Sequence, residues 1–129
     1  METMFSAQTK ILIVDDEPNI LIAIEFLLTR HGFKVEKAND AQEALAILEH
    51  FQPSIILLDV MMPGMDGFEL ARKIRNKPSF EEVRIVFLTA KGTQNDRWTG
   101  YASGAEVYLT KPFDNNELLE TVSELVEYG

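Results

Sequence analysis

Short apolar runs alternate with longer amphipathic segments along the whole chain. Three of the runs are rich in Ile, Leu and Val, which is typical of parallel strands buried on both faces: Ile11–Val14, Ile55–Leu58 and Ile85–Leu88. Two weaker runs, 33–38 and 106–109, indicate two further strands nearer the edges of the same sheet.

The segments between these runs have the spacing of amphipathic helices. A stripe that starts at Ile20 and ends at Leu28 is followed by Gly32, which favours a helix stop there, and the same stripe returns from Leu118 to Val126. Three other segments begin with an Asp followed three residues later by a Glu, a spacing that caps the first turn of a helix: Asp40/Glu43, Asp66/Glu69 and Asp114/Glu117.

The pattern amounts to five consecutive strand–helix units. It predicts an α/β fold with a doubly wound, five-stranded parallel sheet, (βα)5, and helices on both faces. A length of 129 residues suits one domain, and no linker rich in Pro, Gly or Ser divides the chain. We therefore expect a single domain over residues 1–129, with residues 1–9 as a short leader.

Composition narrows the classes of function. The net charge of −9 argues against direct contact with nucleic acid. The absence of Cys excludes disulfides and thiolate metal sites, and no apolar run approaches the roughly 18 residues of a membrane span. A cytoplasmic protein that neither enters a membrane nor binds nucleic acid is the simplest interpretation.

Candidate chemistry gathers where the predicted strands end. Asp15 and Asp16 follow the first strand, Asp59 the third, Thr89 the fourth and Lys111 the fifth. Doubly wound sheets bind ligands at the carboxyl ends of their strands, so these side chains should share one edge.

Each of these residues, taken singly, also has a structural explanation. Asp16 could cap the first helix ahead of Pro18, Asp59 could form the turn that follows it, and Thr89 could simply end a strand. The five residues together favour a common site.

Phosphoryl transfer to a carboxylate is the chemistry that fits this set. Mg²⁺ prefers oxygen ligands, and Asp16 and Asp59 can supply them while Asp15 orients a bound water. The metal and Lys111 would stabilise charge on the phosphoryl oxygens, and Thr89 could donate a hydrogen bond to one of them.

With these motifs in view, the chain resembles the chemotaxis-type receiver domain of two-component response regulators. The resemblance covers about residues 9–128 and implies a flavodoxin-like sheet with strand order 2-1-3-4-5. Its motifs are Val14-Asp15-Asp16-Glu17, Leu58-Asp59, Met62-Pro63-Gly64-Met65-Asp66-Gly67, Leu88-Thr89-Ala90 and Tyr108-Leu109-Thr110-Lys111-Pro112-Phe113.

The resemblance implies a role for each site residue. Asp59 would accept a phosphoryl group from a histidine kinase or a histidine phosphotransfer protein. Asp15, through a water, and Asp16 would hold Mg²⁺ together with Asp59 and the main-chain carbonyl of Met61. Lys111 would bind the phosphate.

The resemblance also implies a conformational switch. Thr89 and Tyr108 would form the switch pair, and the Lys111–Pro112 peptide would be cis. Phosphorylation would change the face formed by the fourth helix, fifth strand and fifth helix, which controls a downstream protein or output domain. Such a domain is no enzyme with a separate substrate, since it only phosphorylates and dephosphorylates itself at Asp59.

Several alternatives compete with this interpretation. A haloacid-dehalogenase-type phosphatase also forms an aspartyl phosphate, but it needs an acid two residues after the nucleophile, where this chain has Met61. An Asp-rich first loop disfavours a flavodoxin, and no P-loop motif is present. A pseudo-receiver that only docks partners stays open, although all five site residues are present.

Assembly can also be addressed from the sequence. Receivers that drive winged-helix domains dimerise through an Asp before the switch aromatic and an Arg on the fifth helix, whereas this chain has Val107 and Thr121 there. Four glutamates of that helix would repel in a symmetric dimer, so we expect a monomer or a weak, phosphorylation-dependent dimer. On the predicted fourth helix, Trp98 and Tyr101 are expected to pack on the sheet.

Overall fold

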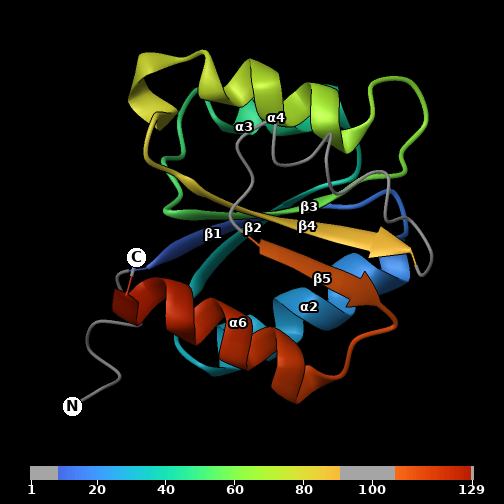
Figure 1. Ribbon diagram of the computed structural model, residues 1–129, viewed down its shortest axis with the longest axis vertical. Coiled ribbons are helices and arrows are strands. Elements are labelled where there is room, and N and C mark those ends of the chain that lie inside the picture. The colour runs from blue at the N-terminus through green and yellow to red at the C-terminus, as the bar shows by residue number, and fades with distance from the viewer. Residues whose placement is uncertain (1–8, 91–106, 129) are drawn as a thin grey trace.

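A computed structural model describes residues 9–90 and 107–128 as a parallel sheet with helices on both faces (Figure 1). Within these residues the sheet has five strands in the order β2-β1-β3-β4-β5, all parallel. The strands are β1 (Lys10–Val14), β2 (Lys34–Ala38), β3 (Ile55–Asp59), β4 (Arg84–Ala90) and β5 (Val107–Lys111). The predicted fold class and strand order are confirmed.

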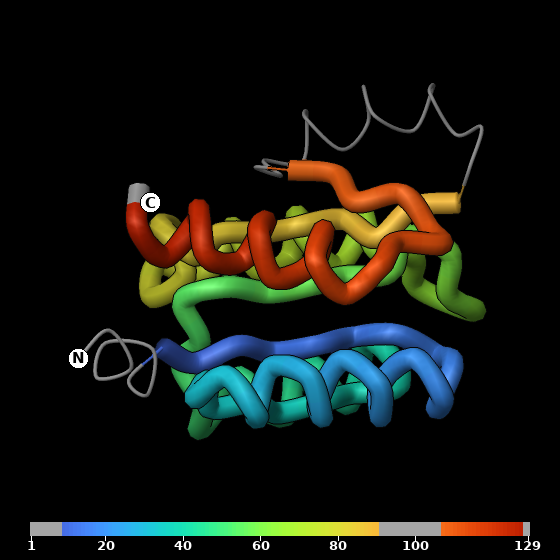
Figure 2. Tube along the Cα trace, turned by 90° about the horizontal axis from the view of Figure 1, so that it is seen from below, coloured from blue at the N-terminus to red at the C-terminus, as the bar shows by residue number. Residues whose placement is uncertain are grey.

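Helices follow the strands: most connect one strand to the next, and the last one follows β5. Those in the described residues are α2 (Pro18–Arg30), α3 (Ala41–Ile47), α4 (Gly67–Arg75) and α6 (Asn115–Tyr128), with a short 3-10 helix, η1 (Pro78–Phe80), before β4. The helix expected between β4 and β5, with Trp98 and Tyr101, lies outside the described residues. In Figure 2, α2 and α6 run back against the direction of the strands.

Strand alternation divides the core into two clusters, one on each face of the sheet. On β4, Ile85 and Phe87 join the cluster between the sheet and α3 and α4. Val86 and Leu88 join the cluster on the opposite face, between the sheet and α2 and α6. The central strands β1, β3 and β4 are buried almost throughout, which explains their unbroken apolar runs. At the edge, β2 exposes charged side chains, which disfavours pairing with another chain.

Helix starts agree with the capping prediction. The carboxylates of Asp40, Asp66 and Asp114 each accept a hydrogen bond from the main-chain N–H three residues later, at 2.8 to 2.9 Å. The Asp114 box is reciprocal, because Glu117 accepts from the N–H of Asp114 at 3.2 Å. These caps satisfy N–H groups that the helices leave without a partner.

The first helix begins differently. Glu17 occupies the N-cap position of α2, no side chain caps that helix, and Pro18 opens its first turn. The alternative that Asp16 serves as the N-cap is therefore wrong: the helix starts one residue too late for it. At its other end, α2 stops before Gly32, whose φ of 93° favours glycine, so the predicted stop is confirmed.

The start of α4 packs directly against the end of β3. A Cβ on Gly67 would lie 2.4 Å from the carbonyl oxygen of Asp59 and 2.9 Å from the Cα of Val60. The Gly67 N–H donates to the carbonyl of Val60 at 3.0 Å. Only a residue without a side chain allows this close approach.

We predict that Gly67→Ala destabilises the fold by about 1–3 kcal/mol, because the added methyl group overlaps backbone that cannot yield cheaply. Helix propensity alone would give the opposite sign, since Ala is the better helix former. Urea unfolding without Mg²⁺ measures the effect.

Gly64→Ala is the matched control, because a Cβ there would meet nothing within 4 Å and only its φ of +79° is unfavourable. We expect Gly64→Ala to cost about 1–2 kcal/mol, from strain alone. A Gly67→Ala variant as stable as the parent would contradict the packing described.

Candidate functional site

Three charged side chains meet at the carboxyl edge of the sheet. The Nζ of Lys111, at the end of β5, lies 3.0 Å from Oδ2 of Asp15, after β1, and 3.3 Å from Oδ1 of Asp59, at the end of β3. Residues 96 and 52 positions apart in the sequence are thereby joined. The parallel topology explains this, because every strand delivers its last residues to the same edge.

Among the described residues, three carboxylates and one ammonium meet at this edge. Asp15, Asp16 and Asp59 each place a carboxylate oxygen within 4.8 Å of the other two. Asp15 is fully buried and Asp59 is 4% exposed, whereas Asp16 is exposed. Main-chain N–H groups support the buried pair: Glu17 donates to Asp15 at 2.9 Å and Met61 to Asp59 at 3.4 Å.

The environment of Asp59 disfavours its charged form. Burial, and then repulsion from Asp15, raise the pKa of Asp59 from 3.8 to about 7, against the attraction of Lys111. A further positive charge beside Asp59 would therefore stabilise its ionised form and lower its pKa.

Lys111 stays charged in this setting. Its burial acts to lower its pKa, but the hydrogen bond to Asp15 and the charges of Asp59 and Asp15 outweigh that effect. The pKa of Lys111 therefore lies above its ordinary value.

The donor set fits a hard divalent cation. All three side chains offer carboxylate oxygen, the ligand type that Mg²⁺ takes, and with Lys111 as the one ammonium that the described residues bring to them the four groups are net negative. Asp16, the exposed member, makes the cluster accessible from solvent. Nitrogen and sulfur ligands, which would favour other metals, are absent from this set of three.

Thr89 and Tyr108 lie on adjacent strands, with Tyr108 two residues further from the carboxyl edge than Thr89. Thr89 is 5% exposed, and Tyr108 is half-buried against the core cluster under α3 and α4. The strand register pairs Phe87 with Tyr108 and Thr89 with Thr110. By alternation, Thr89 and Tyr108 belong to the α3/α4 face, whereas Asp59 and Lys111 have the parity of the α2/α6 face.

Two other predicted features occupy the loops at this edge. The side chain of Met61 is 64% exposed, so it does not depend on packing, and its backbone lies two residues beyond Asp59. The peptide between Lys111 and Pro112 is cis, as expected.

An apolar groove beside the site was not predicted from the sequence. Its volume is ≈ 480 Å³, and it adjoins Lys111. It is lined by Glu17, Ile20, Ala23, Ala90, Lys111, Pro112, Phe113 and Asn115. The sequence pattern assigned Ile20 to the buried side of its helix. The structure shows that Ile20 also lines this groove, together with residues that end β4 and β5.

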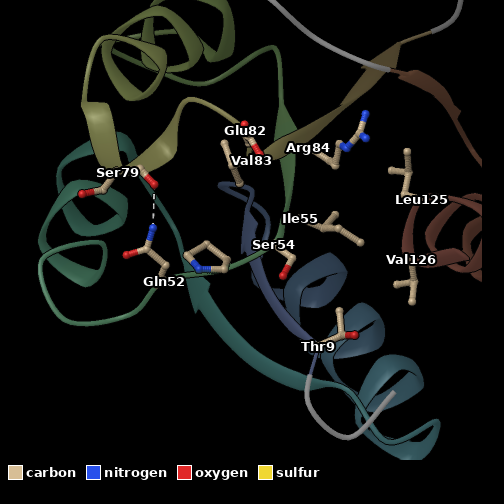
Figure 3. Close-up of a pocket in the computed structure, with 11 residues that line it drawn as sticks. Thr9, Gln52, Ser54, Ile55, Ser79, Glu82, Val83, Arg84, Leu125 and Val126 are labelled. Carbon is tan, nitrogen blue, oxygen red and sulfur yellow. Dashed lines mark hydrogen bonds between the residues drawn. The ribbon is translucent and has the colours of Figure 1, made fainter. Parts of the chain in front are cut away.

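A second groove, of ≈ 420 Å³, lies at the opposite, amino edge of the sheet (Figure 3). Gln52 and Ser79 border one end of it, where the Gln52 side chain donates to the Ser79 carbonyl at 2.6 Å, and Leu125 and Val126 border the other. Among its lining residues only Glu82 and Arg84 are charged, so no cluster of carboxylates forms there. The candidate chemistry therefore belongs to the carboxyl edge.

Comparisons with known proteins identify the family of this chain. Residues 11–123 match the family model of the response regulator receiver domain. Response regulator Rre1 of Synechocystis is 40% identical over 117 residues, which are 90% of this chain and 51% of that protein. The chain thus spans about half the length of this curated relative.

Solved structures are similar over nearly the whole fold. The chemotaxis response regulator CheY4 of Vibrio cholerae has a TM-score of 0.86 and 34% identity, covering 91% of this chain and 98% of that one. The receiver domain of sensor histidine kinase PA1611 from Pseudomonas aeruginosa, solved with a magnesium ion coordinated in its active site cleft, has a TM-score of 0.83 and 32% identity, covering 92% and 98%. The chain belongs to the response regulator receiver domains of two-component signalling.

Proposed function

We propose that Asp59 is the phosphoacceptor of this receiver and that Lys111 and the acidic pair Asp15 and Asp16 assist the transfer. The observation that carries the proposal is the Lys111 ammonium between two buried carboxylates, 3.0 Å from Asp15 and 3.3 Å from Asp59. A carboxylate at a strand end, with a fixed positive charge beside it, has what an acyl-phosphate site requires.

In the proposed step, an oxygen of Asp59 attacks the phosphorus of a phosphohistidine on a histidine kinase or phosphotransfer protein. A P–O bond forms, the P–N bond breaks, and its electron pair returns to the imidazole. Lys111 stabilises charge on the phosphoryl oxygens, and Thr89 donates a hydrogen bond to one of them after transfer.

Asp16 and Asp59 would hold Mg²⁺ directly, with Asp15 acting through a water and Met61 through its main-chain carbonyl. Mg²⁺, when bound, supplies positive charge that offsets the carboxylates and the incoming phosphoryl oxygens. The three converging carboxylates support this assignment, because without added positive charge they repel one another.

The proposed output is a conformational change that involves Thr89 and Tyr108. Phosphorylation would bias two states of the face that includes β5 and α6, and this face would control a downstream protein or an output domain. Self-phosphorylation and autodephosphorylation at Asp59 would be the only reactions. The exposed Met61 supports this over a haloacid-dehalogenase-type phosphatase, which needs an acid there.

The same proposal covers assembly and location. Four glutamates are exposed on α6: Glu117, Glu120, Glu124 and Glu127. Their like charges support a monomer or a weak phosphorylation-dependent dimer, and a partner other than nucleic acid.

Within the described parts of the chain, no helix is both long and apolar enough to cross a membrane. We treat residues 1–129 as one receiver domain, and we propose the cytoplasm as its location because its phosphodonors act there.

Phosphorylation at Asp59 is tested with acetyl phosphate or a histidine kinase. We expect Mg²⁺-dependent, hydroxylamine-labile labelling that Asp59→Asn reduces to background, because the amide cannot form the acyl phosphate. Asp66→Asn, which changes a carboxylate that only caps α4, should retain the label. Stoichiometric labelling of Asp59→Asn would reject the phosphoacceptor and favour a pseudo-receiver or another site.

The metal site is tested by thermal unfolding. Mg²⁺ at about 100 times its Kd should stabilise the folded chain by about 2.7 kcal/mol, because only the folded state assembles the three carboxylates. Asp16→Ala should remove most of this response, whereas Glu36→Ala, an equal charge change on the exposed edge strand, should leave it intact. An unchanged Mg²⁺ response in Asp16→Ala would mean that the metal binds elsewhere.

The pKa of Asp59 predicts how stability depends on pH without Mg²⁺. Between pH 3.8 and about 7 the folded state binds a proton at Asp59 that the unfolded state has released, so stability falls as pH rises through this window. At pH 8, Asp59→Asn should be more stable than the parent, by about 1–4 kcal/mol. Denaturant titrations in EDTA measure this difference, and a less stable variant at pH 8 would contradict the raised pKa.

A further inference from the structure

Three aromatic side chains form a continuous series on the α3/α4 face of the sheet. The rings of Phe68, in α4, and Phe87, in β4, meet edge to face with centroids 4.7 Å apart and an interplanar angle of 90°. The Phe87 ring lies 5.5 Å from that of Tyr108, in β5, at 49°. Phe87 is fully buried and Phe68 is 5% exposed, so the series runs through close-packed core.

One end of this series is fixed to the proposed phosphoacceptor. Phe68 follows Gly67, whose Cα lies so close to β3 that a Cβ would sit 2.4 Å from the Asp59 carbonyl oxygen. The Gly67 N–H also donates to Val60, the residue after Asp59, at 3.0 Å. The backbone at Asp59 and the start of α4, which carries Phe68, are therefore in direct close-packed contact.

The other end of the series lies nearer the surface. Tyr108 is half-buried, whereas the two phenylalanines have almost no exposed surface. Asp59 has the parity of the α2/α6 face and Tyr108 that of the α3/α4 face. Asp59 and Tyr108 therefore belong to opposite faces of the sheet, and the turn from Asp59 to Gly67 and Phe68 connects these two faces.

We propose that Phe87 is a positioning residue that couples the Asp59–Gly67 turn to the ring of Tyr108. The inference rests on the proposed function of Asp59 and adds a route that does not pass through Thr89. Phe87 contacts Phe68 edge to face and Tyr108 in a tilted arrangement, so it is the ring that the two contacts share. Leucine at position 87 keeps the site apolar but removes both ring contacts, which uncouples Tyr108 from the turn.

The test is fluorine NMR of the full chain labelled with 3-fluorotyrosine, with and without Mg²⁺ and beryllofluoride, a mimic of the acyl phosphate. The chain has three tyrosines, and Tyr108→Phe assigns the resonance of interest. We expect beryllofluoride to shift the Tyr108 resonance in the parent. In Phe87→Leu the change in the ring's conformational equilibrium should be about 2- to 30-fold smaller.

Two further variants make the result specific. Phe68→Leu breaks the series at its other end, and in a double-mutant cycle it should add little to Phe87→Leu, because both remove the same coupling. It also gives the same test if Phe87→Leu does not fold. Ile85→Val is the control: it lies on the same face of β4, two residues earlier and outside the series, and should retain the full Tyr108 response.

Fluorine signals from bound beryllofluoride separate failure of this inference from failure of the proposed function. If beryllofluoride does not bind at the Asp59 site in the parent, the proposed function fails. If it binds to the parent and to Phe87→Leu alike, and Tyr108 responds equally in both, the coupling through Phe87 is wrong. A Tyr108 response lost in Ile85→Val as well would likewise overturn it, since any core change would then suffice.

Discussion

The Lys111 ammonium between Asp15 and Asp59 is the interaction on which the rest of the site depends. Burying two carboxylates side by side is unfavourable, and the raised pKa of Asp59 is the direct consequence of that burial and of the neighbouring charge of Asp15. One ammonium only partly offsets the repulsion. Among the described residues, the carboxylates at the end of β3 therefore keep an excess of negative charge. In the proposed function, a divalent cation balances that charge when the phosphoryl donor binds.

In this fold the strands provide a rigid framework, and the residues at their carboxyl ends and in the loops beyond them form the site. Central strands buried on both faces fix the positions of their last residues, while the loops beyond them carry the exposed groups Asp16 and Met61. Gly67 packs the start of α4 directly against the end of β3, so the turn after Asp59 is joined to the α3/α4 face. Asp59, which has the parity of the α2/α6 face, is thereby linked through close packing to the aromatic residues of the α3/α4 face.

Much of the fold could be predicted from the sequence, because buried parallel strands and capped helices have strong local patterns. The strand order and the identities of the side chains at the carboxyl edge followed from the resemblance and from the rule that strands end together. The short helix at Pro78–Phe80, the uncapped start of α2 and the groove beside Lys111 did not. Neither helix start has the Asp-to-Glu capping spacing, and the groove is formed by segments that are distant in the sequence. Nor could the pKa of Asp59 or the ring contacts of Phe87 be read from residue types, since both are set by distances and burial in the folded chain.

The central claim is that Asp59 itself carries the phosphoryl group. Borohydride reduces an aspartyl phosphate to homoserine, so mass spectrometry of the reduced, digested protein locates the modified residue directly. The account predicts homoserine at position 59, formed only when both phosphodonor and Mg²⁺ were present. Homoserine at Asp15, Asp16 or another carboxylate, with position 59 unmodified, would contradict it.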